Sequence, residues 1–306
     1  MKIKPEVSVI MSVYNGEKHI DECIRSIHEQ THSNFEFIIV NDASTDTTVD
    51  ILKSWKEKDN RIRILHNKTN KERAISRNRA ILAAQAPLIA VIDADDCALP
   101  ERLSLQTAFM RENPEVQILG GGMLIYDTNE HICHLTSNDL IRSCLFFDCA
   151  IFHPTTMLRK EVLTKYNKWY NPMLPPAEDY GLWGDLLLIP EAVFSNITTP
   201  LVRYRASHGT RPQYELKQFN NANLVRSKII DYLGLKPTDE NIRCHLGLLF
   251  KNASAWNVTP KQCAHWGKQL IAANTQKPLT SPSAFEATII DRIEKVFTVD
   301  AIQKFN

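Results

Sequence analysis

Hydrophobic and polar positions in the first third of the chain follow two periods in alternation. Helical periodicity places Ile20, Cys23, Ile24 and Ile27 on one apolar face. A second helix is expected within residues 41–57, capped by Ser44 or Thr45, and a third over residues 72–85. Short apolar runs typical of buried strands occupy residues 7–13, 35–40, 61–65 and 86–92. Strands that alternate with helices predict parallel pairing through right-handed crossovers, which defines an α/β fold.

After the fourth strand the rhythm changes. We expect a helix with Pro100 in its first turn and, later, a turn at Thr128–Glu130 between strands. The pattern predicts strands within 116–135, a strand and a short helix in 150–163, an irregular three-proline loop at 167–176, a helix at 177–189 and an extended segment at 196–207. From Tyr214 the pattern is helical to the end, with breaks near Gly234, Pro260 and Pro278. Two regions are therefore predicted, residues 1–213 and a helical extension over 214–306.

Composition excludes several classes of protein. The net charge is +1 and no basic stripe is present, so nucleic acid is not an expected partner. Seven scattered cysteines without CxxC spacing favour neither a disulfide framework nor a zinc site and fit a reducing cytosol. The amino end lacks a small-residue cleavage site, and no apolar run approaches the roughly 18 residues needed to span a bilayer. A cytoplasmic location is expected.

Three carboxylates follow the fourth strand. In "VIDADDCALPERL", Asp93, Asp95 and Asp96 stand at the carboxyl end of an apolar run, where open α/β sheets place their ligands. Like charges this close raise one another's pKa unless a cation lies between them. The alternative is a helix cap with solvated surface acids, and Asp96 is as good a candidate for the cap as for a ligand. We interpret the cluster as a cation site.

Polar and aromatic residues also close the first two strands. Ser12 and Tyr14 lie in "MSVYNGE" and Asp42 in "IVNDAS". Because parallel strands bring their carboxyl ends to one edge, these side chains should converge with the acids. Tyr14 could stack on a flat base and Asp42 could accept a ring N–H, although singly they fit ordinary packing and a turn. Together they predict a nucleotide site.

These segments, with "SRNRAI" between them, resemble the inverting glycosyltransferases of family two, which have the Rossmann-like GT-A fold with helices on both faces of a mostly parallel sheet. The resemblance covers roughly residues 6–206. It implies a UDP-sugar donor and Mn²⁺ or Mg²⁺, which prefer oxygen ligands. Ser12, Tyr14 and Asp42 would bind the base and adjacent sugar, and Arg77 would lie near the nucleotide. Asp93 would face the ribose or diphosphate, and Asp95 would ligate the metal.

The second half carries the family's other signature, "HPTTMLRKEVL" followed by "AEDYGLW". By resemblance, Asp179 of the Glu178–Asp179 pair is the general base toward the acceptor; the alternative is that both acids only stabilise a helix start. His153 fits an ordinary buried histidine. The family often shows Tyr-Arg-x-His, whereas "RYRASHGT" places His208 one residue late, which removes the basis for assigning it to the diphosphate.

The resemblance therefore implies a metal-dependent inverting glycosyltransferase that moves sugar from a UDP-sugar to a hydroxyl of a glycan or glycolipid, in polysaccharide or cell-envelope glycan synthesis. Residues 1–127 would form the nucleotide-sugar half and 128–213 the acceptor half. The helical extension is a candidate for covering the acceptor site, for homo-oligomer contacts or for peripheral contact with the inner face of a membrane. Alternatives are a non-catalytic nucleotide-sugar-binding protein and a haloacid-dehalogenase-type phosphatase, which would need Thr or Val at position 97, where this chain has Cys.

Overall fold

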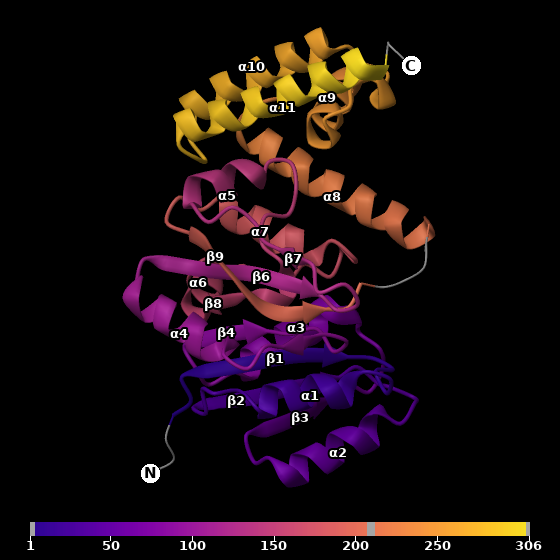
Figure 1. Cartoon of the computed structure of the whole chain (residues 1–306), viewed down its shortest axis with the longest axis vertical. Helices are drawn as coiled ribbons and strands as arrows, with labels where there is room; N and C mark the ends of the chain where they lie inside the picture. Colours follow the sequence, from indigo (N-terminus) through magenta and orange to yellow (C-terminus); the bar gives the residue numbers. More distant parts are fainter. Residues whose placement is uncertain (1–3, 207–211, 304–306) are drawn as a thin grey trace.

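A computed structural model describes residues 4–206 and 212–303 of the chain, so His208 lies outside the described residues. The first third consists of strands and helices in strict alternation (Figure 1). Their bounds are β1 Val7–Val13, α1 Ile20–His28, β2 Phe35–Asn41, α2 Thr48–Lys58, β3 Ile62–His66, α3 Glu72–Ala83 and β4 Leu88–Val91. All four predicted strands are present, and each begins and ends within two residues of its predicted bounds.

The middle of the chain extends this sheet with shorter elements. They are β5 Cys97–Ala98, α4 Arg102–Glu112, β6 Val116–Ile125, β7 His131–Ile132, α5 Asn138–Cys144, η1 His153–Thr155, β8 Met157–Arg159, α6 Lys160–Lys165, α7 Glu178–Leu187 and β9 Val193–Tyr204. The predicted turn at Thr128–Glu130 separates β6 from β7, and residues 167–176 contain no helix or strand. The two-residue strand β5 was not predicted, because so short a run has no period.

The sheet has the order β3-β2-β1-β4-β8-β6-β9-β5 in the described residues, with β7 on the side of β6. Its parallel pairings join β3, β2, β1 and β4, and also β6 with β9. The strands β8, β5 and β7 pair antiparallel with their neighbours. The carboxyl ends of β1, β2 and β4 therefore lie at one edge, as the crossover rule predicts.

Strand alternation divides the core between the two faces of this sheet. On β1, Ile10 points into one hydrophobic cluster, whereas Val9 and Met11 point into the other. The cluster around Met11 is covered by α1, α2 and α4, and the cluster around Ile10 is covered by α3 and the later helices. Helices thus cover both faces, because each face of a buried parallel sheet must be shielded from water.

The chain ends in four long helices, α8 Pro212–Tyr232, α9 Asp239–Phe250, α10 Pro260–Gln276 and α11 Pro282–Gln303, with the short turn η2 Ser254–Trp256 after α9. Thr238 and Thr259 cap α9 and α10 through reciprocal capping boxes. The interruptions predicted near Gly234, Pro260 and Pro278 are confirmed. The last three helices lie at the opposite end of the molecule from the N-terminus (Figure 1).

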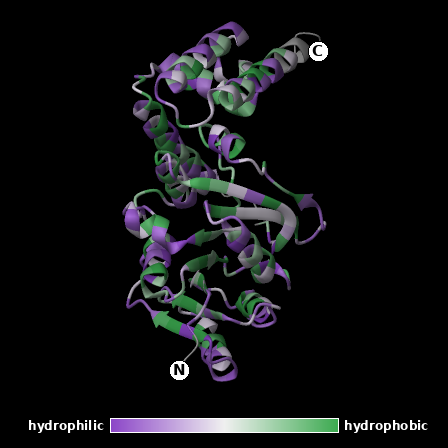
Figure 2. Ribbon diagram, turned by 90° about the vertical axis from the view of Figure 1, so that its left-hand side faces the viewer, coloured by the Kyte–Doolittle hydropathy of each residue, from purple (hydrophilic) through white to green (hydrophobic). Residues whose placement is uncertain are grey.

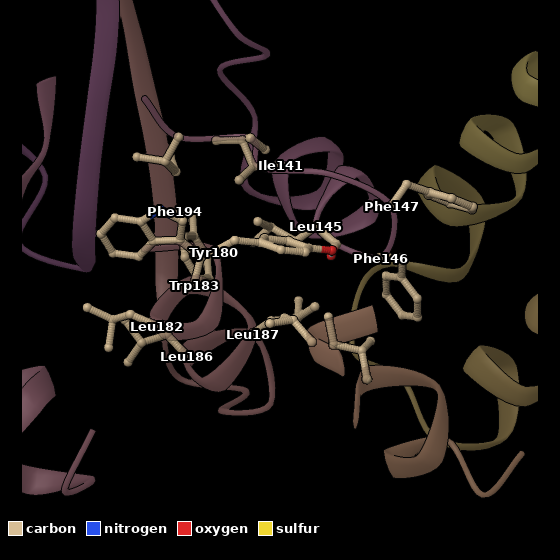
Figure 3. Close-up of a cluster of buried hydrophobic side chains, with 14 of the residues drawn as sticks. Ile141, Leu145, Phe146, Phe147, Tyr180, Leu182, Trp183, Leu186, Leu187 and Phe194 are labelled. Atoms are coloured by element: carbon tan, nitrogen blue, oxygen red, sulfur yellow. The ribbon is translucent and has the colours of Figure 1, made fainter. Parts of the chain in front are cut away.

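The helical extension shares its core with the sheet. Figure 3 shows aromatic and aliphatic side chains of α5, of the segment that follows it and of α7 in one cluster. The Tyr180 hydroxyl donates to the Leu145 carbonyl at 2.8 Å. The same cluster includes Ile10 of β1 and Val296 of α11. Hydrophobic and hydrophilic residues alternate along the helices (Figure 2). The division at residue 213 stays a prediction, and the hydrophobic core is continuous across it.

Two helix starts differ from the sequence-based expectations. Helix α2 begins at Thr48 after Thr47, and neither Ser44 nor Thr45 caps it; both take part in contacts between loops. Helix α4 begins at Arg102, so Pro100 precedes the helix, and Asp96 does not cap it. Both errors arise because the hydrogen-bond partners of these polar residues are distant in sequence.

Among the described residues, no helix is long and apolar enough to cross a bilayer. Helix α11 exposes two large apolar side chains one heptad apart, Ile290 and Phe297, which are 45% and 48% exposed. No partner for this face is defined. Homo-oligomer formation and membrane contact through the extension therefore stay predictions.

Asp59 fastens α1, α2 and β3 together and gives the fold a measurable pH dependence. Although burial alone would raise it, hydrogen bonds from Arg61 and His28 lower the Asp59 pKa to about 2. Because the folded-state pKa is depressed, the stabilisation is present above the unfolded pKa of about 3.9 and is lost as pH falls through about 2.

Asp59→Asn should therefore lower the free energy of unfolding by about 1–2 kcal/mol at pH 7 and flatten its decline below pH 4. Urea denaturation of wild type and variant at pH 7 and below pH 4 tests this. The matched control is Asp50→Asn, at an exposed position. If both variants lose the same free energy of unfolding at pH 7, the prediction is contradicted.

Candidate active site

A cleft of about 750 Å³ opens at the carboxyl ends of β1, β2 and β4. Six of the residues predicted from the sequence line it, namely Ser12, Tyr14, Asp42, Arg77, Asp93 and Asp95. The first turns of α8 close another side through Tyr214, Glu215 and Gln218. Asp179 is not among the lining residues. The sheet edge thus brings the predicted nucleotide-site residues together, and the helical extension adds residues that the sequence motifs did not indicate.

Two loops at this edge are interlocked by hydrogen bonds. The backbone N–H of Asn15, after β1, donates to Ser44 Oγ at 3.0 Å, and the N–H of Thr45, after β2, donates to Asn15 Oδ1 at 2.9 Å. Glu17 Oε2 accepts from both the N–H and the hydroxyl of Thr47. These bonds hold the two loops together. Tyr14, which is 50% exposed, therefore lies on a backbone that the neighbouring loop restrains.

Asp42 is buried beneath these loops at 3% exposure. Its Oδ1 accepts from Asn67 Nδ2 at 2.6 Å and from the backbone N–H of Lys71 at 2.9 Å. Both bonds fall on the same oxygen. The other carboxylate oxygen, Oδ2, is therefore the one that can accept an N–H from a ligand in the cleft, as a base with a ring N–H requires.

Arg77 is surrounded by carboxylates. Its Nη2 donates to Asp93 Oδ1 and its Nη1 to Glu178 Oε1, each at 2.7 Å, and its side chain is only 4% exposed. Burial lowers the pKa of a guanidinium, but Asp93 and Glu178 outweigh it and raise the Arg77 pKa. Arg77 in turn holds the pKa of Asp93 well below its usual range despite burial. The guanidinium lies beside the cleft as predicted, although its donors serve protein carboxylates.

The pKa values of Asp95 and Asp96 shift in the opposite direction to that of Asp93. Burial and the nearby Asp93 charge raise the pKa of Asp95, and the same causes raise the pKa of Asp96 to about 9. Asp96 Oδ1 accepts the backbone N–H of Arg205 at 2.8 Å, while its buried Oδ2 has no hydrogen-bond partner. Carboxylates that destabilise one another in this way fit a site for a divalent cation.

The described residues contain no group of three or more His, Cys, Asp or Glu side chains arranged to hold a metal ion by themselves. Such a cation would need further oxygen ligands from a bound diphosphate and water, which is how Mg²⁺ usually binds beside nucleotide phosphates. The oxygen donors present at Asp95, and the unpartnered Oδ2 of Asp96, fit a hard divalent cation.

Asp179 follows Glu178 at the start of α7. It is partly buried and its Oδ1 accepts the backbone N–H of Tyr180 at 2.7 Å. Burial raises the Asp179 pKa, an effect that Glu178 reinforces and His153 opposes. His153 contacts Asp93 Oδ2 at 3.4 Å through Nδ1 and the Tyr170 hydroxyl at 3.0 Å through Nε2, so this histidine belongs to the polar network of the site.

Two cleft residues lie outside the motifs noted in the sequence. Arg73 is one helical turn before Arg77, so the repeat Arg-x-x-x-Arg on α3 could have indicated it. Arg205, which belongs to the quoted segment "RYRASHGT", also lines the cleft; it packs its guanidinium on the Tyr126 ring at 3.7 Å and donates to the Asp95 carbonyl. Tyr214 had no sequence signal, because the helical extension carries no recognisable motif.

The parallel strands that end at an acid-lined cleft define an α/β protein with a candidate ligand site at one edge of its sheet. The chain belongs to glycosyl transferase family 2, whose model matches residues 8–166, just over half of the chain. An uncharacterized glycosyltransferase of Methanocaldococcus jannaschii is 35% identical over 59% of this chain and 64% of that protein, less than two thirds of its length. The O-antigen biosynthesis glycosyltransferase WbnJ of Escherichia coli is 31% identical over 73% of this chain and 88% of that protein.

The fold of the chain also matches that of a solved structure. The structure of TarS 1–349 of S. aureus in complex with UDP-GlcNAc matches with a TM-score of 0.65 and 20% identity, over 98% of this chain and 91% of that chain. The match includes the helical extension, because it covers nearly the whole chain. The predicted GT-A fold with C-terminal helices is confirmed.

Backbone strain surrounds the cleft and generates a prediction. Three residues without a glycine's freedom have positive φ there, Asn15 at 51°, Ala43 at 64° and Glu72 at 67°. Glutamate in this region pays a steric penalty that glycine avoids, so Glu72→Gly should raise the free energy of unfolding by about 1 kcal/mol. The adjacent Lys71 has φ of −115°, and Lys71→Gly should instead destabilise. Denaturant titration of both variants checks this; a loss of stability in Glu72→Gly equal to that in Lys71→Gly would refute it.

Proposed function

We propose that this chain is a metal-dependent inverting glycosyltransferase that moves a sugar from a UDP-sugar to a hydroxyl group of a glycan or glycolipid. The observation that carries the proposal is the Asp93–Arg77–Glu178 bridge. It connects the cleft to Glu178, the first residue of α7, which is followed directly by the candidate base Asp179. Family 2 membership supports sugar transfer, and the names of WbnJ and TarS in complex with UDP-GlcNAc support the polysaccharide context and the UDP donor.

The donor's base would occupy the slot between the interlocked loops. Tyr14 supplies an exposed ring for stacking, and Asp42 Oδ2 accepts the ring N–H of uracil. Ser12 lies at the end of β1 beside both. A charge-assisted hydrogen bond contributes roughly 1.5–3 kcal/mol, which is enough to favour uracil over a base that offers an acceptor at that position.

Asp95 would hold the divalent cation, with Asp93 facing the ribose or diphosphate. When bound, Mn²⁺ or Mg²⁺ would neutralise charge on the departing UDP. Arg77 lowers the pKa of Asp93 and favours its ionised form. Its oxygens already contact Arg77 and His153, and each carboxylate oxygen has a second lone pair with which it could accept from the donor. Arg205 holds the acidic loop in place, because its backbone N–H donates to Asp96 Oδ1 and its side-chain Nε donates to the Asp95 carbonyl.

Asp179 would remove the proton from the acceptor hydroxyl as its oxygen attacks the anomeric carbon opposite the leaving UDP. Attack from the opposite face inverts the configuration, so an α-linked donor gives a β-linkage. Burial raises the Asp179 pKa, which strengthens its carboxylate as a base. A binding protein without catalysis would have no need of this carboxylate.

The metal assignment predicts a selective loss in Asp95→Ala. Wild-type protein should bind UDP more tightly with Mn²⁺ than without it, and Asp95→Ala should lose most of that difference because its carboxylate is the proposed ligand. Isothermal titration with UDP, with and without Mn²⁺, measures the difference. Glu72→Gln, an acid of the same cleft, is the matched control. An undiminished Mn²⁺ effect in Asp95→Ala would remove Asp95 from the metal site.

The base assignment predicts that Asp179→Asn nearly abolishes transfer. Asparagine keeps the shape but cannot accept the proton, so the rate should fall about 10²–10⁴-fold while donor affinity and melting temperature stay close to wild type. Transfer assays with one working donor–acceptor pair measure this, with Asp185→Asn on the same helix as control. If Asp179→Asn retains more than about a third of the wild-type rate, the carboxylate is not the base.

A further inference from the structure

The diphosphate of a nucleotide donor needs cations in a cleft that is lined by several carboxylates. Two arginines of the cleft are already engaged. Arg77 binds Asp93 and Glu178. Arg205 donates to the Asp95 carbonyl and to Glu22, and its guanidinium is stacked on Tyr126. Neither has a guanidinium that turns freely toward a ligand.

Arg73 differs from both. Its side chain is 45% exposed and lines the cleft. Nε lies 3.4 Å from Glu178 Oε1, and Nη2 donates to the Tyr214 hydroxyl at 2.8 Å. The third nitrogen, Nη1, takes part in neither contact. The guanidinium is therefore held at two points with donors left over, an arrangement suited to binding phosphate oxygens.

The position of Arg73 is unfavourable for the helix that carries it. It is the second residue of α3, where a cation opposes the helix dipole, and it follows the strained Glu72. Both features lower stability. Strain of this kind is concentrated at functional sites, where the surrounding structure imposes it.

Tyr214 reaches Arg73 from the helical extension. Residues 212–218, the first two turns of α8, are exposed, and the buried residues of this helix begin at Val225. These turns therefore contribute little to the core. Nevertheless Tyr214, Glu215 and Gln218 line the cleft, and the Tyr214 ring lies 6.0 Å from the Arg73 guanidinium carbon. The helical extension therefore contacts the Arg73 guanidinium at the edge of the cleft.

We propose that Arg73 binds the diphosphate of the nucleotide-sugar donor and that Tyr214 is the positioning residue that aims its guanidinium. The helical extension is then part of the donor site. The identity of the diphosphate as that of a UDP-sugar rests on the proposed function, whereas the diphosphate site itself rests on the geometry of Arg73.

Binding of UDP and of uridine, which lacks phosphate, separates this role from a merely structural one. In one Mg²⁺ buffer, Arg73→Ala should weaken UDP binding about tenfold or more and leave uridine binding unchanged, because only the charge-assisted bonds to phosphate are lost. Tyr214→Phe, which removes only the hydroxyl, should weaken UDP binding a few-fold with the same selectivity. Leu216→Ala, at a 60% exposed position on the same turn, is the matched control and should match wild type for both ligands.

Equal losses for UDP and uridine, or wild-type UDP affinity in Arg73→Ala, would overturn the inference. If the melting temperature of Arg73→Ala is well below that of wild type, the variant Arg73→Gln is measured instead, because glutamine lacks the charge but fills much of the same space. If wild-type protein binds neither UDP nor uridine, the UDP donor is wrong and inorganic pyrophosphate becomes the probe. Pyrophosphate binding that depends on Arg73 would then sustain the diphosphate site, and its absence would reject it.

Discussion

The buried ion bridge of Arg77 is the interaction on which the rest of the site depends. Its guanidinium joins a carboxylate at the end of β4 to one at the start of α7, and the bond to Glu178 connects residues 101 positions apart. Removing one partner from such a bridge leaves an unpaired buried charge, which typically destabilises by about 3–5 kcal/mol. The bridge therefore ties the end of β4 to the start of α7, and Arg73 and His153 contact the same two carboxylates.

Rigidity and charge in the cleft have different origins. Beside Tyr14, two loops bind each other, so the proposed base could bind without first ordering the backbone, which reduces the entropic cost of binding. The charged part of the cleft, where we propose that the diphosphate binds, instead depends on residues from separate elements, with α3, the acidic loop and α8 each contributing. A glycosyltransferase needs both properties, because the nucleotide must be recognised and the leaving group must also be released.

The sequence was sufficient to predict the first four strands and the residues that gather at their carboxyl ends, because apolar runs and the acids that follow them are local signals. It was insufficient where partners are remote. Asp96 pairs with the backbone of Arg205, 109 positions away, rather than with the next helix, and Arg77 pairs with Glu178, 101 positions away. Tyr214 stands in a segment without motifs, and only the packing of α8 brings it to the cleft. Short β5 exists through its pairing with β9.

The hydrophobic cluster that unites Ile10 of the first strand with Val296 of the last helix has a consequence for how the chain folds. The family-wide segment 8–166 ends inside this cluster, before Trp183 and Phe194 supply their share of the buried surface. The smallest unit that can fold on its own is therefore larger than the segment shared across the family. We therefore expect the sheet and the helical extension of this chain to gain and lose their structure together, so that the stability of the cleft depends on helices that do not line it.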